Sequence, residues 1–194
     1  MAQTGVLVPD GDGTTLQLTP ISGTHFDEVA NGVSTPTDST FLQHTGNSTA
    51  TDFLDFEDMP GDFDVAIDVV GRMRTVLTGV VDDTVTMDFD IFNAAETSVI
   101  ENLAALAGNH SITNTTGSAQ ANTDNAAAWD GYKMRLQVNR SNSGMPDSIQ
   151  ADFSEVEIDI QYDVTAGETD AEKAIASIPQ GDPQVMRATE AVAY

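Results

Sequence analysis

The sequence predicts an all-β protein: an antiparallel two-sheet sandwich of the jelly-roll type, with one short helix and an extended C-terminal arm. Three observations carry this prediction. Apolar and polar residues alternate along several segments, turn-forming residues separate short segments, and 40% of the 194 residues are hydrophobic, enough to bury a core. Because alternation leaves one face wet, antiparallel sheets are favoured over parallel ones. The order of the strands is left open.

Three weaker strand candidates begin the chain, at residues 5–8, 15–19 and 39–44. Between the first two lies PDGDGTT, Pro9–Thr15. We interpret it as a hairpin turn, because Gly accepts positive φ and Asp bonds nearby backbone N–H groups.

A calcium loop is the alternative for PDGDGTT. Counted from Asp10, the ligand positions of an EF-hand loop require Asp or Asn at the fifth place, Gly at the sixth and Glu at the twelfth. The chain has Thr14, Thr15 and Ile21 there. A cation at Asp10 and Asp12 is therefore the weaker interpretation.

The segment 54–64, LDFEDMPGDFD, gathers acidic residues between two strand candidates. We expect a solvated edge loop, with a cation site in the Asp55–Asp64 loop as the functional alternative. A pair of catalytic carboxylates cannot be selected by proximity from 31 acidic residues.

Four segments alternate well enough to define the side that each strand should bury. The expected buried sides are Val65, Ile67 and Val69; Val85, Met87, Phe89 and Ile91; Tyr132, Met134, Leu136 and Val138; and Val156, Ile158, Ile160, Tyr162 and Val164.

One segment departs from alternation. Residues 96–108 place five apolar side chains at helical spacing and end in Gly108, a favourable residue just beyond a helix, so we predict a short helix there. Residues 111–115 form a weak strand candidate. The polar residues 114–127 predict a long surface loop that ends at Trp129.

Residues 1–164 are expected to form the sandwich domain and residues 165–194 the arm. The arm contains small, dispersed apolar residues and two prolines, so it cannot build its own core and would become ordered by contact with a partner. A mobile terminus is the alternative. The expected partner contacts are Ile175, Ile178, Val185, Met186 and Tyr194.

Charge restricts the partners. The chain has 31 acidic and 7 basic residues and a net charge of −24. Such self-repulsion is tolerable in concentrated salt, where the Debye length falls to about 3 Å at 1 M, so we expect a halophilic source. An acidic marine or intracellular protein is the alternative. Without a basic patch, direct nucleic-acid binding is not expected.

The motifs of common enzymes are absent from the sequence, and we expect no enzyme and no cofactor. There is no cysteine, no GxSxG, SxxK or phosphate-binding loop, and His25, His44 and His110 share no spacing motif. The start of the chain does not resemble a signal peptide and no segment is apolar enough to span a membrane, so synthesis in the host cytoplasm and no membrane partner are expected.

Four N-x-[ST] patterns begin at Asn47, Asn109, Asn114 and Asn139. All are expected in turns or loops, where a glycan fits. Modification at these positions is left open.

The order of these elements resembles a family of structural proteins of tailed viruses. The resemblance rests on VLVPDGD, HFDEVANG, PTDSTFL, the strand MPGDFDVAIDVVGRMR, and later AAAWDGYKMRLQV and SEVEIDIQYDV, over residues 5–164. These are strand and turn signatures rather than chemical sites. The acidity is similar to that of proteins from viruses of halophilic archaea.

The resemblance implies a virion protein without catalysis, on the particle surface. A capsid decoration or turret component, homo-oligomeric and bound to the major capsid protein, is the first hypothesis; a neck, tail or fibre component is the second. A carbohydrate-binding module for host attachment is the alternative from another class. It is disfavoured because Tyr132 and Tyr162 fall on expected core faces, which leaves few aromatic side chains for a sugar platform.

Overall fold

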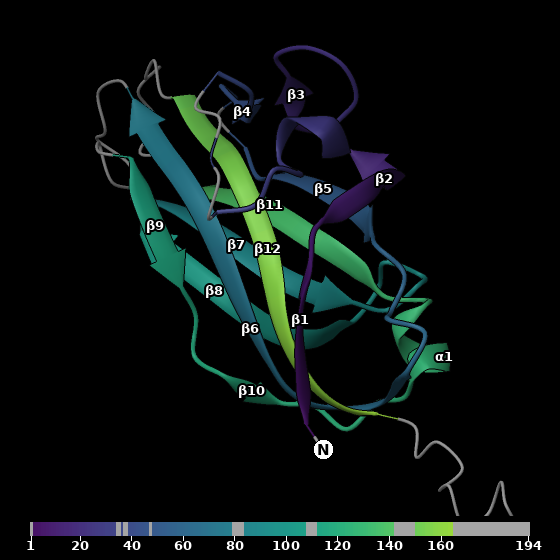
Figure 1. Ribbon diagram of the computed structural model, residues 1–194. Coiled ribbons are helices and arrows are strands. Elements are labelled where there is room, and N and C mark those ends of the chain that lie inside the picture. Colours follow the sequence, from purple (N-terminus) through teal and green to yellow (C-terminus); the bar gives the residue numbers. More distant parts are fainter. Residues whose placement is uncertain are drawn as a thin grey trace, which may run out of the picture. The chain divides into compact units, whose positions relative to one another are not determined.

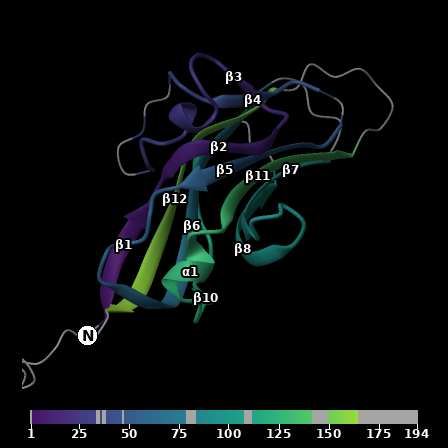
Figure 2. The same ribbon diagram turned by 90° about the vertical axis from the view of Figure 1, so that its right-hand side faces the viewer.

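The alternating segments form the central strands of two antiparallel sheets that pack face to face, as the sequence predicts (Figures 1 and 2). The computed structural model describes residues 2–33, 36, 39–46, 48–78, 84–107, 112–141 and 150–164. The predicted arm, residues 165–194, lies outside the described residues, so the proposed domain boundary stays a prediction. Within the described residues no helix is long and apolar enough to cross a membrane.

Sheet A is built around two long strands that pair along almost their whole length, β6 (Phe63–Thr78) and β12 (Gln150–Val164). The strand order is β10-β6-β12-β4-β3, with β1 paired to β12 and β9 paired to β6. The short strands are β1 (Gln3–Leu7), β3 (Thr19–Pro20), β4 (Leu42–His44), β9 (Thr113–Thr116) and β10 (Gln120–Ala121).

Sheet B has the order β2-β5-β11-β7-β8. Its strands are β2 (Pro9–Leu16), β5 (Ala50–Phe56), β7 (Thr84–Phe92), β8 (Val99–Ala107) and β11 (Lys133–Ser141). A 3₁₀ turn, η1 (Phe26–Glu28), follows β3, and a short helix, α1 (Ala126–Trp129), precedes β11.

The core lies between the sheets and contains most of the side chains that alternation predicted. On β7, β11 and β12 every expected residue is buried except Tyr132 and Val164, which are half-buried. On β6 the prediction is wrong at Val65 and Ile67, and Ala66 is buried instead. A register shift causes this, since Gln161 pairs with Asp68 and Tyr162 with Ala66, which leaves Ile67 as an extra residue.

The helix predicted at residues 96–108 is wrong, because this segment forms β8 and pairs with β7. Register shifts in that pairing bury Leu103 and Ala104 in succession, so the apolar spacing imitates a helix. The helix lies instead at α1, where the Asn125 side chain accepts a hydrogen bond from the Ala128 N–H at 3.1 Å.

The turn predicted at Pro9–Thr15 is also wrong, because these residues lie in β2, an irregular edge strand of sheet B. Its glycines serve close packing: a Cβ on Gly13 would lie 2.4 Å from the Phe53 carbonyl oxygen. The loop predicted at 114–127 contains most of β9, all of β10 and the start of α1.

Candidate functional site

Two parts of the sandwich carry unusual polar chemistry: the segment between β2 and β5, which includes β3 and β4, and a groove on the outer face of sheet B. On β12 the first part of the side predicted to be wet is buried, at Glu155 and Glu157, whereas Gln161 and Asp163 are exposed as predicted. Asp152, Glu155 and Glu157 are each at most 3% exposed. The segment that we call the N-terminal strap, residues 17–33 and 39–45, supplies partners for buried carboxylates on this side of the fold.

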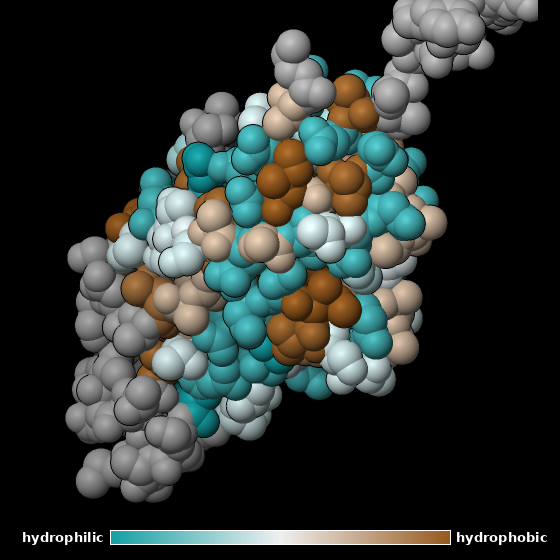
Figure 3. All heavy atoms as spheres, turned by 90° about the horizontal axis from the view of Figure 1, so that it is seen from below, coloured by the Kyte–Doolittle hydropathy of each residue, from teal (hydrophilic) through white to brown (hydrophobic). Residues whose placement is uncertain are grey.

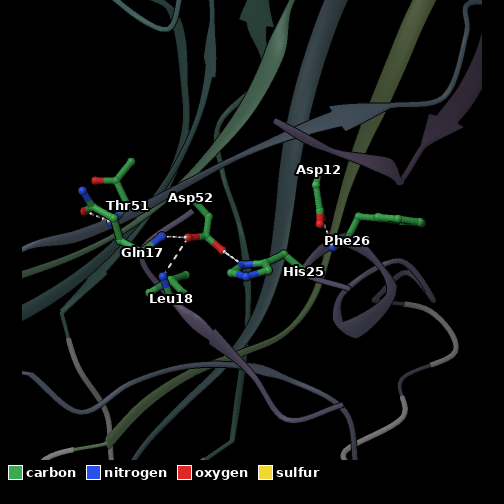
Figure 4. A network of polar contacts seen from close by, with 7 residues as sticks. All are labelled: Asp12, Gln17, Leu18, His25, Phe26, Thr51 and Asp52. Atoms are coloured by element: carbon green, nitrogen blue, oxygen red, sulfur yellow. Dashed lines mark hydrogen bonds and ion pairs between the residues drawn. The ribbon is translucent and has the colours of Figure 1, made fainter. Parts of the chain in front are cut away.

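Asp52 of β5 is the first anchor of the strap (Figure 4). Its side chain is fully buried, and Oδ1 accepts hydrogen bonds from the backbone N–H groups of Gln17 at 2.6 Å and Leu18 at 2.8 Å. Its Oδ2 lies 2.6 Å from Nδ1 of His25. Nearby, Asp12 accepts a hydrogen bond from the Phe26 N–H at 2.9 Å. This arrangement orients His25 as a structural partner that ties the strap to the sandwich.

Two further carboxylates order the strap farther along: Glu28 joins two parts of the strap to each other, and Glu157 of β12 anchors it to the sandwich. Glu28 is 1% exposed and accepts hydrogen bonds from the N–H groups of Ser22 at 2.5 Å and Phe41 at 3.1 Å. Glu157 accepts one from the Val33 N–H at 2.9 Å and lies 3.6 Å from the Arg72 guanidinium. Asp52, Glu28 and Glu157 thus accept mainly from backbone donors, which suits a chain with few basic residues.

The outer face of sheet B carries a groove of about 500 Å³. Its floor is formed by charged residues of β7 and β11, and its wall by the β9–β10 segment, which packs so closely on β8 that a Cβ on Gly117 would lie 1.6 Å from the Leu103 carbonyl oxygen. The polar side chains of the lining are Asp88, Asp90, Asn102, Thr115, Thr116, Ser118, Gln120 and Arg135.

Arg135 organises the groove floor. Its Nε and Nη2 both donate to Asp90, and its guanidinium lies 4.5 Å from the centre of the Phe92 ring, which packs edge-on against Phe53. Burial raises the pKa of Asp90 and of Asp88, against the lowering effect of Arg135. The floor is therefore a rigid, partly desolvated set of donors and acceptors.

The turn between β7 and β8 contacts β2 through one side chain. Glu96, between β7 and β8, accepts hydrogen bonds from the Thr14 N–H at 2.9 Å and the Thr15 hydroxyl at 2.8 Å. Burial raises the pKa of Glu96, but these bonds and the nearby Lys133 charge outweigh it and hold the pKa below its ordinary value. Sequence reasoning missed Glu96 because no local motif marks a contact 82 residues away.

The acidic loop behaves as the solvated interpretation expected. Glu57, Asp58, Asp62 and Asp64 are exposed, and Asp55 is half-buried and paired with Lys133. Asp10 and Asp55 line a small cavity of about 170 Å³. Over the described part of the chain no group of three or more acidic, histidine or cysteine side chains has the geometry to hold a metal ion.

The other histidines and glycan-pattern asparagines that the sequence singled out do not come together in one site. His44 hydrogen-bonds the Ser48 carbonyl at 2.8 Å. Asn114 and Asn139 lie in β9 and β11 rather than in turns, which corrects the expectation for these glycan patterns. The remaining predicted residues lie outside the described ranges: Asn47, Asn109, His110, Ile175, Ile178, Val185, Met186 and Tyr194.

Over the described residues, the tryptophan and tyrosine side chains offer no exposed platform. Trp129 is fully buried and packs edge-on against Phe56 and Tyr132. The Tyr132 hydroxyl donates to Asp124 at 2.7 Å; burial, this bond and neighbouring carboxylates raise the pKa of Tyr132 to about 12. Tyr162 is 5% exposed, as predicted.

Comparison with known proteins gives only distant likenesses. No protein-family profile and no curated protein sequence matches the chain. Among solved structures, it is similar to the enzymatically active domain of tailspike protein 4 of bacteriophage CBA120, at 11% identity and a TM-score of 0.39, over 78% of this chain and 18% of that one. At 10% identity and a TM-score of 0.39, it is similar to TmCBM61 in complex with beta-1,4-galactotriose, over 80% of this chain and 86% of that one.

A third similar structure is that of infectious bursal disease virus, Gx strain, at 11% identity and a TM-score of 0.25, over 99% of this chain and 47% of that one. The similar structures thus include viral proteins and a carbohydrate-binding module. Likeness at this level transfers no functional residue to this chain.

Proposed function

We propose that the chain is a structural component of a virus particle that attaches through the end of the sandwich that carries the start of β1 and the end of β12. The observation that carries the proposal is the pairing of Gln3 with Tyr162 in sheet A. The start of β1 and the end of β12 therefore lie side by side at one end of the sandwich (Figure 1). This end of the sandwich is the one through which we propose that the chain attaches.

The strap and the charge support this role. Three carboxylates of the sandwich, Asp52, Asp12 and Glu157, hold the strap in place, so its described residues form a fixed part of the surface. The net charge of −24 disfavours contact with packaged nucleic acid and favours a location outside the shell. A capsid decoration or turret component that contacts the major capsid protein is our first choice, and a neck, tail or fibre component the second.

The test uses the full chain, expressed from the genome that encodes it. Replacing Ile175 and Ile178 together by Asp should leave a folded protein that no longer co-purifies with particles on a density gradient, because the apolar contacts of the arm are lost. The matched control replaces Val99 and Ile112, which are exposed on the sandwich at 42% and 49%. Full incorporation of the arm variant would overturn the arm's role, and absence of the wild-type chain from particles would overturn the virion role.

The groove on sheet B favours a second candidate, a carbohydrate-binding role in host attachment. Its volume of about 500 Å³ is within the range of small-ligand sites, and amide, hydroxyl and carboxylate groups line it. A glycan array in concentrated salt tests it. Binding that is lost when the exposed Asn102 is replaced by Ala would support this role, whereas an array without any bound glycan would reject it.

A further inference from the structure

Strand β1 (Gln3–Leu7) forms an open edge of sheet A. It pairs with β12 on one side, and no other described strand pairs with it. Gln3, Thr4 and Val6 are exposed, and Val6 at 53% is the most exposed of the large hydrophobic residues described. An open strand edge is a template for pairing with another strand.

This edge lacks the usual protection against pairing. Residues 2–9, AQTGVLVP, contain no charged side chain, and the strand itself contains no proline. Elsewhere, 31 acidic residues are spread over the chain. Two copies of such a chain repel each other wherever acidic surfaces meet, so an uncharged edge is a place where they can approach closely.

A shallow apolar groove continues from the edge over the outer face of sheet A. The groove has a volume of about 500 Å³, and its apolar lining residues include Val6, Val70 and Ala119. Seen from the lower end of the molecule, the surface is mostly hydrophilic with separate hydrophobic patches (Figure 3). At the groove, Asp159 is paired with Arg72, which reduces its charge toward a neighbour.

We propose that β1 pairs antiparallel with β1 of a second copy, across a two-fold axis at Gly5. The inference rests on the virion component proposed above, which we expect to be a homo-oligomer. It names the surface through which two copies pair. In this register Thr4 lies opposite the partner's Val6, and Val6 lies opposite the partner's Thr4. Both pairs join β-branched side chains on the outer face, a combination that stabilises neighbouring strands. The two sheets A become one continuous sheet.

The strength of the contact depends on salt. Five residues of edge bury less than the roughly 800 Å² per partner of a standard interface, so the pairing is weak by itself. Repulsion between two chains of charge −24 opposes it at low salt. The dimer fraction should therefore rise between about 0.1 M and about 1 M salt, as the Debye length falls from about 10 Å to about 3 Å.

The experiment uses the absence of cysteine from the chain. The full-length Thr4→Cys and Val6→Cys variants are oxidised in concentrated salt, separately and mixed. Directly opposed residues lie close enough for a disulfide, whereas diagonal ones do not, so the mixture should give several times more covalent dimer than either variant alone. Mixed Val99→Cys and Ile112→Cys variants, at similarly exposed positions, give the background. In parallel, light scattering of the Val6→Lys variant should show a monomer, and Ile112→Lys should keep the wild-type mass.

Each of these results either supports or overturns the proposed pairing of β1 with β1. A mixture that cross-links no better than the background overturns the pairing, even if Val6→Lys is monomeric, because another segment then occupies the edge. A Val6→Lys variant with wild-type mass, or a wild-type chain that is monomeric at every salt concentration, overturns it as well. None of these results touches particle attachment, which is measured on particles.

Discussion

At the scale of single residues, close backbone contacts and long-range hydrogen bonds decide what the sequence pattern leaves open. Gly13 is the clearest case. The tandem Asp–Gly pattern suggested a turn, but the glycine is needed because β2 crosses the Phe53 carbonyl at a distance that leaves no room for a side chain. In a single sequence, a glycine that forms a turn cannot be distinguished from a glycine that lets two strands approach closely.

Replacing Gly13 by Ala should therefore destabilise the fold, by about 1–3 kcal/mol, because the added methyl group forces β2 away from β5. Gly61→Ala is the matched control, since a Cβ at Gly61 has no heavy atom within 4 Å. Chemical denaturation measures both. Equal stability of the two variants would show that β2 adjusts without cost.

Glu96 is a second residue with a specific consequence. Its φ is +57°, a left-handed conformation that side chains rarely adopt, and its carboxylate holds β2. Because its pKa lies below the ordinary value of 4.5, the charged form stabilises the fold above that pH, and this contribution disappears as the pH falls through the lowered pKa.

Glu96→Gln should lower the thermal midpoint at neutral pH, while the difference from wild type should vanish in acid. Thermal unfolding followed by circular dichroism at a series of pH values checks this. Ala95→Gln, at an exposed neighbour in the same turn, controls for a general change there. A difference that stays constant with pH would contradict the role of the charge.

At the scale of elements, regular strands could be predicted and irregular ones could not. β7 and β11 alternate without interruption, so their buried sides follow from the sequence. β8 was taken for a helix because two register shifts disturb its period. The outer side of β12 was predicted to be wet, and this is wrong only at Glu155 and Glu157, because no local signal shows that these two acids will be buried.

The strap depends on Asp52. An Asn at this position keeps the shape of the side chain but can no longer accept on both oxygens, so Asp52→Asn should cost about 2–3 kcal/mol. The strap should also open locally, and limited proteolysis should cleave first within residues 17–45. Asp64→Asn, at an exposed acid, should change neither. Unchanged protection of the strap in Asp52→Asn would reject the anchor.

At the scale of the whole molecule, composition predicted the class of fold but not the sites. The hydrophobic content, the alternation and the spacing of turn-forming residues are properties of the entire chain, and they led to an antiparallel sandwich. The sheet-B groove joins residues of β7, β8, β9, β10 and β11. Such a site depends on strand order, which the sequence alone did not reveal.

The net charge of −24 gives a whole-molecule prediction. Raising salt from about 0.1 M to about 1 M should increase the free energy of unfolding, because screening relieves repulsion in the compact state. Urea denaturation at each salt concentration measures it, since urea itself is uncharged. Maximal stability at low salt would contradict the halophilic interpretation.

The central claim is that the chain is a repeated building block of a virus particle. Quantitative mass spectrometry of purified particles from the virus that encodes it tests this most directly. The account predicts that the chain is present in many copies per particle and remains bound through washing in molar salt. Its absence from purified particles, with the chain recovered only from the soluble fraction of the host, would contradict the account.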